Sequence, residues 1–556
     1  MTSSIRSLRI LDLPTEILLS ITQDIDPEDS LRLLQCCRAL HCLGDIKAFW
    51  INVCTRLQQR IRIHRKQLQD LSIDELRASM KRGLRLERKW SGAPEVDPSP
   101  IRRIVLDTTQ HHVVGARDIA VTWIWFLDDG KHVLCVIDDR IIQLWNIPVN
   151  RMLVCFFVGG ELERAAKHIV GDHILIAGSV SLEEDGVHVD RFRVWKLEIN
   201  EFPTEEEPTR LIDIIVPQRT EFTMVTDTFA GAVYLDSPSS AKRSDLHPNY
   251  SDDLHMILID LDSSSRYVQA YTPLRYFDKH ETNLRMDHFR ITKSETRMYV
   301  HITTGTMDLV TYAYDFQQLA AALPTMGPQR PKLVIKPYLL VHYSLPPHLS
   351  ALFNEPTCGF WGDSCLWNRR QIGMFGAFSQ INSESTINEL GITLSVLGLD
   401  HEDQIATVQD KLDVRHEVYD MPVIYVIPEH YIMSRTPDAF VLVGQPKKSR
   451  SVAWAMTDRD SDRQITTLAI SHFSTKTIPD SGDEDVRMRL DGDTAPPHPM
   501  DHHPSQVSMN RGQVILIDTE NWILDSEEIH DMDLDDFHGR VGVGAGNGKA
   551  LILEFV

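Results

Sequence analysis

The first stretch that could do chemistry is a glycine-rich run ending in lysine, Gly-Val-Gly-Ala-Gly-Asn-Gly-Lys at positions 542–549. Backbone N–H groups of such a run could hold a phosphate, but a phosphate-binding loop needs glycine six positions before its lysine and a hydroxyl after it. Those places hold Val543 and Ala550. The run also leads into an apolar stretch typical of a strand, whereas a phosphate loop opens a helix. We therefore predict a β-hairpin.

Two further stretches could supply a nucleophile or a metal site. Ser364 lies in a Gly-Asp-Ser-Cys-Leu segment, but no strand–helix framework that would activate a serine surrounds it. His498, His502 and His503 lie beside Asp501 in a proline-broken tract, where no preformed metal site is expected. No His-Glu-x-x-His or paired Cys-x-x-Cys motif occurs in the sequence. We predict a protein that is not an enzyme, with no catalytic residues, cofactor or metal.

Composition excludes several classes of protein. The 556 residues include 57 basic and 79 acidic side chains, a net charge of −22, which argues against a general nucleic-acid binder because phosphate attracts positive charge. No apolar run reaches the length of a transmembrane helix, so no membrane partner is expected. The eight cysteines are too few for a disulfide framework in so long a chain. A reducing compartment, the cytoplasm and/or the nucleus, is the expected location.

The first fifty residues predict a bundle of short helices. Pro14 suits a first helical turn, and Glu16 adds a negative charge that the helix dipole favours there. Ile17, Ile21 and Ile25 then recur at every fourth position, which predicts one apolar stripe on one helix.

A second helix is predicted to begin at Asp26, which can cap it, with Pro27 in the first turn. Its apolar residues run from Leu31 to Leu40, and a third short segment ends at Trp50. So small a bundle has more apolar surface than it can bury by itself, so we expect part of that surface to bind a partner.

This segment resembles an F-box over residues Leu8 to Cys54, on the strength of its Leu-Pro-x-Glu-Ile-Leu opening, the Cys37-Arg38 pair and the terminal Trp50. The resemblance implies that the segment docks on the Skp adaptor, which links F-box proteins to a cullin-based ubiquitin ligase. It implies these adaptor-binding or motif-supporting positions: Leu13, Pro14, Glu16, Ile17, Ile21, Leu31, Leu33 and Trp50.

The segment departs from the F-box pattern at four positions. Ser30 and Gln35 stand where the family usually has apolar residues, Cys36 replaces a usual valine, and Leu40 replaces a common aromatic residue. These changes could weaken docking while the fold is kept. The alternative is that the bundle is only a helical cap on a β domain.

A basic connector follows the bundle. Ser72 and Glu75 form a predicted capping box that opens a helix running to Trp90, and three prolines mark a boundary over Ser91–Pro100. The connector is either a patch for nucleic acid or import, or a solvated helix that spaces two domains. The predicted domains are an F-box-like helical domain at 1–55, a basic helical linker at 56–100 and a β-propeller-like domain at 101–556.

From Arg102 onward short apolar strands alternate with turns. Trp123–Leu127, His132–Ile137 and Ile141–Ile147 make most of one four-stranded blade, with a hairpin turn signal at Asp128-Asp129-Gly130. A second copy follows, with strands predicted at His168–Gly178 and Arg191–Leu197.

The strand ends Leu144–Ile147 and Val194–Leu197 resemble those of WD repeats, with the usual aspartate after tryptophan replaced by Asn146 and Lys196. The fold class is therefore multidomain α plus all-β, with a propeller of about seven irregular blades behind the helices. We expect the ring to close by pairing a strand at Arg102–Leu106 with the last strand. A sandwich of two β domains is the rival, and a disordered insertion is expected near 475–510.

The combined pattern predicts a substrate-receptor subunit of a cullin-based ligase of the SCF type. The F-box binds the Skp adaptor and through it a cullin scaffold, while the propeller recruits an unknown protein substrate. Trp361 and Trp367 flank a loop and are the candidates for substrate contact. The alternatives are a non-ligase propeller scaffold with a structural helical cap, and a propeller hydrolase, for which the sequence shows no catalytic set.

Overall fold

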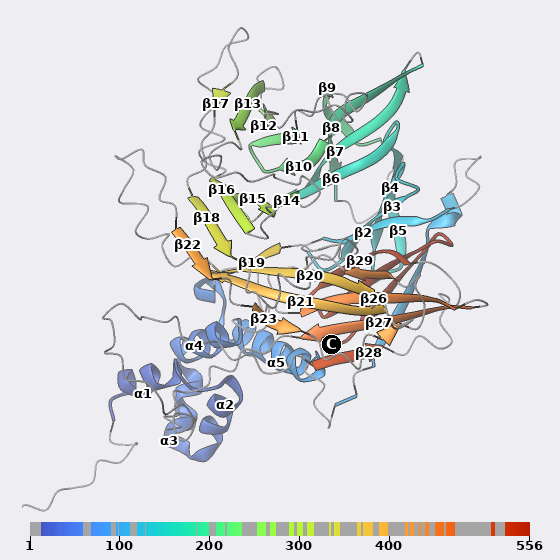
Figure 1. The fold of residues 1–556 in the computed structure, drawn as a ribbon. Coiled ribbons are helices and arrows are strands. Elements are labelled where there is room, and N and C mark those ends of the chain that lie inside the picture. Colours follow the sequence, from blue (N-terminus) through green and yellow to red (C-terminus); the bar gives the residue numbers. More distant parts are fainter. Residues whose placement is uncertain are drawn as a thin grey trace, which may run out of the picture.

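The helices gather on one side of the molecule and the sheets on the other (Figure 1). This is a computed structural model of the chain. It describes residues 13–58, 68–90, 96–235 apart from short gaps, the strands between residues 253 and 517, and residues 529–556. The helices are α1 (Thr15–Thr22), α2 (Pro27–Cys36), α3 (Arg38–His41), α4 (Lys47–Gln58) and α5 (Ile73–Trp90), with the 3-10 turns η2 (Cys42–Asp45) and η3 (Leu68–Asp70).

Local signals set most of the helix boundaries. Asp26 caps α2 by accepting a hydrogen bond from the backbone N–H of Glu28 at 2.9 Å, as its sequence predicts. Pro14 lies one position earlier than predicted, as the cap of α1 rather than in its first turn. α1 also ends at Thr22, so Ile25 lies outside the predicted stripe. The predicted helix through Leu40 is interrupted, because Cys37 is extended and separates α2 from α3.

The predicted capping box opens α5. The backbone N–H of Ser72 donates to the Glu75 carboxylate at 2.7 Å, and the Glu75 N–H donates to the Ser72 hydroxyl at 3.2 Å. The apolar residues of this helix are buried, among them Leu76, Met80 and Trp90. The connector is therefore packed against other elements along one face and is not a fully solvated spacer.

Seven separate sheets make up the rest of the described chain. The first two are β2 (Val121–Phe126), β3 (His132–Ile137), β4 (Ile141–Asn146) and β5 (Arg151–Phe157), then β6 (Glu161–Val170), β7 (His173–Glu184), β8 (Val187–Glu198) and β9 (Thr209–Val216). The third is β10 (Thr220–Val225), β11 (Phe229–Leu235), β12 (Asp253–Asp260), β13 (Tyr267–Pro273) and β17 (Leu333–Val334). The fourth is β14 (Phe289–Lys293), β15 (Arg297–Thr303), β16 (Leu309–Asp315), β18 (Leu339–Ser344) and β22 (Glu417–Asp420).

The fifth sheet is β19 (Ser364–Asn368), β20 (Gln371–Ile381), β21 (Asn388–Gly398), β23 (Val423–Val426) and β24 (Met433–Ser434). The sixth is β25 (Phe440–Val443), β26 (Ser451–Asp460), β27 (Arg463–His472) and β28 (Gln513–Ile517). The last, the closing sheet, is β1 (Arg102–Asp107), β31 (Lys549–Glu554), β30 (Arg540–Ala545) and β29 (Ile529–Asp535). The short turn η4 (Thr108–His111) follows β1.

Where the structure describes their packing, neighbouring sheets follow chain order, as in a propeller and not as in the two layers of a sandwich. Separate buried clusters join the closing sheet to β2–β5, β2–β5 to β6–β9, and β6–β9 to the β10 sheet. First strands lie next to each other, as β2 does with β29, β6 with β10 and β14 with β19, so they line the inside. Several four-stranded antiparallel sheets thus match the predicted propeller. The blade number stays a prediction.

Turn residues explain the first predicted blade. Gly130 adopts a positive φ of 68° between β2 and β3, and Asp129 accepts hydrogen bonds there from the N–H groups of Lys131 and His132. The predicted second copy contained one error. The segment His168–Gly178 is not one strand, because a turn at Gly171, with φ of 57°, separates β6 from β7.

The predicted ring closure is present. β1 pairs antiparallel with β31, so that Leu106 lies opposite Ala550, and the two ends of the β region share one sheet. Aspartates of β29 add a second connection between the closing sheet and its neighbour. Asp531 and Asp533 accept hydrogen bonds from the backbone N–H groups of Ile124 and Phe126 in β2, at 2.8 and 2.7 Å. They satisfy donors on the edge of β2 that its own sheet leaves unpaired.

Replacing Asp533 with alanine is expected to destabilise the β region by about 1–3 kcal/mol, because the buried N–H of Phe126 would lose its acceptor. The urea midpoint of the full chain measures the effect. Asp533→Asn is the control, since its amide oxygen can still accept the bond and should retain most of the stability. Equal midpoints for wild type and Asp533→Ala would contradict this role.

Candidate functional site

The exposed apolar face of α1 is the first part of the candidate site. Ile17 and Ile21 lie one helical turn apart, and 48% and 36% of their surfaces are exposed, high values for isoleucine. Pro14 and Glu16 are exposed beside them, and Leu13 is half-buried. Five of the eight predicted adaptor-binding residues therefore lie on or beside one short helix, with two apolar side chains facing solvent.

The second part comes from α2. Leu31 and Leu33 are half-buried and pack on the edge of the helical core, whose buried member in this helix is Leu34. These two leucines are accessible only in part, so any contact with a partner would use their outer atoms. The face of α1 is thus the more exposed portion of the site.

Trp50 lies in the interior, with 4% of its surface exposed. Its indole N–H donates to the carbonyl of Gly44 at 2.6 Å, its ring meets Phe49 edge-on at 5.2 Å, and the Arg77 guanidinium lies 5.2 Å from its centroid. Of the two roles that the resemblance allows for Trp50, adaptor binding or support of the motif, its burial favours support. It joins α4 to η2 and α5.

The four departures from the family pattern have different surroundings. Ser30 is fully buried, and its hydroxyl has no hydrogen-bond partner among the described residues, a cost that an apolar side chain would avoid. Leu40 is buried in the helical core, where it replaces an aromatic residue. Gln35 and Cys36 are exposed and leave the core unchanged.

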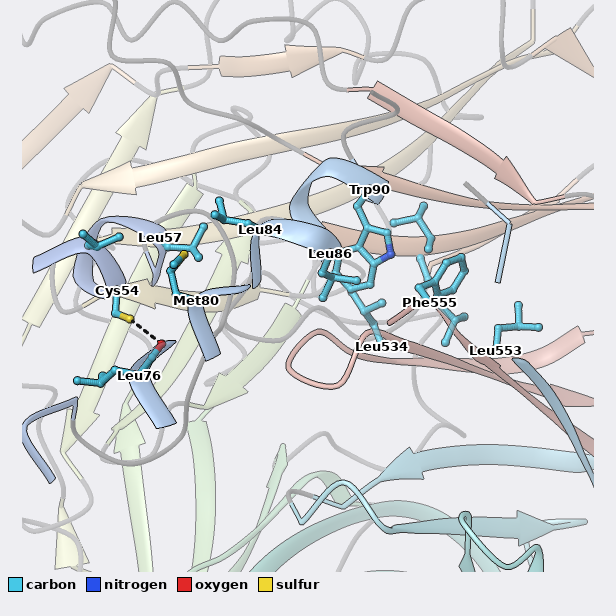
Figure 2. Packing of buried hydrophobic residues seen from close by; sticks show 14 of the residues in the cluster. Cys54, Leu57, Leu76, Met80, Leu84, Leu86, Trp90, Leu534, Leu553 and Phe555 are labelled. Atoms are coloured by element: carbon cyan, nitrogen blue, oxygen red, sulfur yellow. Dashed lines mark hydrogen bonds between the residues drawn. The ribbon is translucent and has the colours of Figure 1, made fainter. Parts of the chain in front are cut away.

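The core below this site continues into α5 (Figure 2). Leu57 of α4 packs with Leu76 and Met80 of α5, and the Cys54 thiol donates to the carbonyl of Leu76 at 3.6 Å. Burial raises the pKa of Cys54 to about 12, so the thiol stays neutral and unreactive. α5 therefore completes the hydrophobic core of the helical bundle.

The other end of α5 packs on the closing sheet. The Trp90 ring lies 6.3 Å from that of Phe555, and Leu86 and Leu534 belong to the same buried cluster (Figure 2). The Lys89 ammonium donates to the carbonyl of Phe555 at 3.2 Å, and burial lowers its pKa while Asp97 opposes that shift. One continuous core thus joins the helical bundle, including Leu18 and Leu19 of α1, to the sheets.

A family comparison decides what the helical bundle is. The F-box-like family model matches residues 10–56. Residues 10–56 are an F-box-like domain. The matched range ends within α4. In this chain α5, which lies outside that range, packs against the F-box-like domain and completes its hydrophobic core.

Two solved structures are similar to the chain. The β-propeller domain of Cps50 (Swd1) from Myceliophteria thermophila is 10% identical with a TM-score of 0.39, and the match covers 78% of this chain and 97% of that chain. Raptor from Chaetomium thermophilum is 8% identical with a TM-score of 0.37, over 79% of this chain and 28% of that chain. No curated protein matches the sequence.

The F-box family consists of non-catalytic adaptor subunits, and F-boxes bind Skp adaptors in general. Among the described residues no group of three His, Cys, Asp or Glu side chains could hold a metal ion. No helix in the described part of the chain is long and apolar enough to cross a membrane. The glycine-rich run at 542–549 forms the end of β30, a tight turn and the start of β31, which confirms the predicted hairpin.

Several predictions lie outside the described residues. These are Trp361, the histidine tract around His498 and the insertion near 475–510. Trp367 is in β19, where the structure describes the strand but not the side chain, and Ser364 begins that strand. The substrate contacts assigned to the two tryptophans stay predictions.

Sequence reasoning missed one contact that positions the F-box-like domain. Arg82 of α5 lies over the ring of Phe537 at 4.0 Å, in the turn between β29 and β30. The basic residues of α5 are the sequence signal for this contact, but they equally predict a solvated helix or a patch for nucleic acid or import. A cation over an aromatic ring is favourable when partly desolvated.

Proposed function

We propose that this chain is the substrate-receptor subunit of a cullin-based ubiquitin ligase of the SCF type. In this proposal the α1 face with Ile17 and Ile21 binds the Skp adaptor, which connects the chain to a cullin scaffold. The propeller-like region binds a protein substrate, and the ligase acts in the cytoplasm, the nucleus or both. The chain supplies proximity and orientation to a reaction catalysed by other subunits.

The observation that carries the proposal is the exposed apolar pair on an F-box-like domain that shares a core with the sheets. Isolated exposed apolar residues are common, but two adjacent ones on a domain whose family binds adaptors are best explained as an interface. The shared core supports function as well, because a receptor must hold its substrate at a defined distance from the adaptor.

Co-expression with the Skp adaptor followed by size-exclusion chromatography and light scattering tests the proposal. We expect a stable one-to-one complex that also recruits a cullin scaffold. A folded chain that forms no complex would overturn the proposal. It would leave a propeller scaffold with a structural helical cap.

A further inference from the structure

Buried hydroxyl groups gather where the β6–β9 sheet meets the β10 sheet. The Oγ atom of Ser179 in β7 and the Oγ1 atoms of Thr220 and Thr223 in β10 have no hydrogen-bond partner among the described residues. These three residues are 0%, 1% and 2% exposed, so bulk solvent does not reach them. A buried hydroxyl without a partner is destabilising, and native proteins contain few of them. Three at one junction therefore need a physical explanation.

The strand register places Ser179 on the face of the β6–β9 sheet that packs on the β10 sheet. Ala177 and Phe192 belong to the buried cluster between these two sheets. Ser179 lies two positions after Ala177 in β7 and pairs with Phe192 of β8, so it shares their face. One step further along this face Ser181 pairs with Asp190, whose Oδ1 atom is also buried without a partner among the described residues. This face therefore changes from apolar to polar toward the end of β7.

The opposing face of the β10 sheet changes in the same way. Ala232 and Tyr234 of β11 belong to the same buried cluster. Thr223 pairs with Ala232 and Thr220 pairs with Tyr234, so both threonines lie on the face that packs on β6–β9. Val225, at the other end of β10, is an apolar member of the cluster. The start of β10 therefore contributes hydroxyl groups to the junction, and its end contributes apolar side chains.

The polar parts of the two faces lie at the same end of the sheets. Asp190 pairs with Val216, the last residue of β9, and β10 begins at Thr220. Four residues of extended chain span at most about 14 Å, so the strand positions of Asp190 and Thr220 cannot lie at opposite ends. β10 also packs directly on β6 and β7, as Figure 1 shows. The two threonines therefore lie across the junction from Ser179 and Asp190.

The chemistry of these four oxygen atoms indicates what binds them. A hydroxyl group both donates and accepts a hydrogen bond, and a carboxylate oxygen accepts one. A water molecule donates and accepts, so it can bond to every member of the set, and buried waters typically make about three such bonds. A metal ion is disfavoured, because no group of three His, Cys, Asp or Glu side chains in the described part of the chain could hold one.

We propose that ordered water molecules bind between the β6–β9 and β10 sheets and bridge Ser179 and Asp190 to Thr220 and Thr223. The waters supply the hydrogen bonds that these side chains lack, and they join the two sheets beside their shared apolar cluster. The junction of the closing sheet with β2 differs, because there the aspartates of β29 accept directly from backbone N–H groups. This water site belongs to the sheets and does not depend on adaptor binding.

The sign of a stability change tests the proposal. Thr223→Val removes one hydroxyl and nearly keeps the shape of the side chain. If water bonds to that hydroxyl, the variant loses a hydrogen bond, and the melting temperature of the full chain should fall by about 1–3 °C in differential scanning calorimetry. Ser179→Ala should lower it as well. Ser30→Ala is the matched control, because the Ser30 hydroxyl is buried without a described partner in the helical core, and its removal should keep or raise the melting temperature.

A high-resolution crystal structure of the full chain shows the occupant directly. We expect water molecules within about 3 Å of at least two of the four oxygen atoms. The melting temperature should be the same in EDTA and in calcium chloride. A calcium-dependent rise that Asp190→Asn abolishes would identify a bound cation instead of water and overturn the proposal. A higher melting temperature for Thr223→Val, or direct hydrogen bonds between the two sheets at these atoms, would overturn it as well.

Discussion

Replacing Ile17 and Ile21 with aspartate is expected to weaken binding of the Skp adaptor by about a thousandfold, or about 4 kcal/mol. Both side chains are exposed on α1, so the substitution should cost little in folding. In the complex each aspartate would place a charge in an apolar contact without a partner, which opposes binding strongly. Isothermal titration calorimetry with the purified adaptor measures the loss.

Val149→Asp is the matched control for this experiment. Val149 is 64% exposed, but it follows β4 in the sheet region and lies outside the F-box-like domain. The Val149→Asp protein should bind the adaptor with the affinity of wild type. The circular dichroism spectra of the Val149→Asp and Ile17→Asp/Ile21→Asp proteins should match that of wild type. Wild-type affinity in the Ile17→Asp/Ile21→Asp protein would show that α1 does not form the interface.

Replacing Trp90 with alanine is expected to lower the free energy of unfolding by about 3–5 kcal/mol, the usual cost of removing a buried tryptophan. Trp90 is fully buried where α5 meets the closing sheet, and its ring packs on Phe555. Because one core joins the helices to the sheets, we expect wild type to unfold in a single transition and the variant to show two. Differential scanning calorimetry distinguishes these outcomes.

Trp90→Phe and Trp123→Ala are the controls for the interface. The Trp90 indole N–H is buried without a hydrogen-bond partner among the described residues, so phenylalanine should retain most of the stability. Trp123 lies in β2 and is only half-buried, so its loss should cost less than that of Trp90. A Trp90→Ala protein as stable as wild type would show that α5 does not join the two regions.

Local sequence signals predicted much of the candidate site. The cap at Asp26, the capping box at Ser72 and Glu75, and the four-residue spacing of Ile17 and Ile21 all depend on neighbours within one or two helical turns. The family pattern supplied the remaining positions. It could not predict that Trp50 is buried, because its burial depends on contacts with Phe49, Gly44 and Arg77 that only the packed bundle creates.

The β region follows the same division. Paired strands with a turn signal, such as β2, β3 and β4, could be predicted because the apolar pattern of each strand and the residues of the turn lie close together in the sequence. The hairpin hidden in His168–Gly178 was missed because Gly171 and Asp172 interrupt an otherwise continuous apolar run. The pairing of β1 with β31 could be inferred only as a way to remove two sheet edges.

By itself the sequence determined the helical bundle, its F-box pattern, the repeated short strands and the excess negative charge. The tertiary structure alone decided that α5 packs between the bundle and the closing sheet, that Trp50 is buried, and that Ile17 and Ile21 are exposed. The physical reason is the sequence separation over which each interaction acts. Caps, turns and periodicity act between neighbours in the chain, whereas burial depends on which distant segments meet, and no local pattern specifies that meeting.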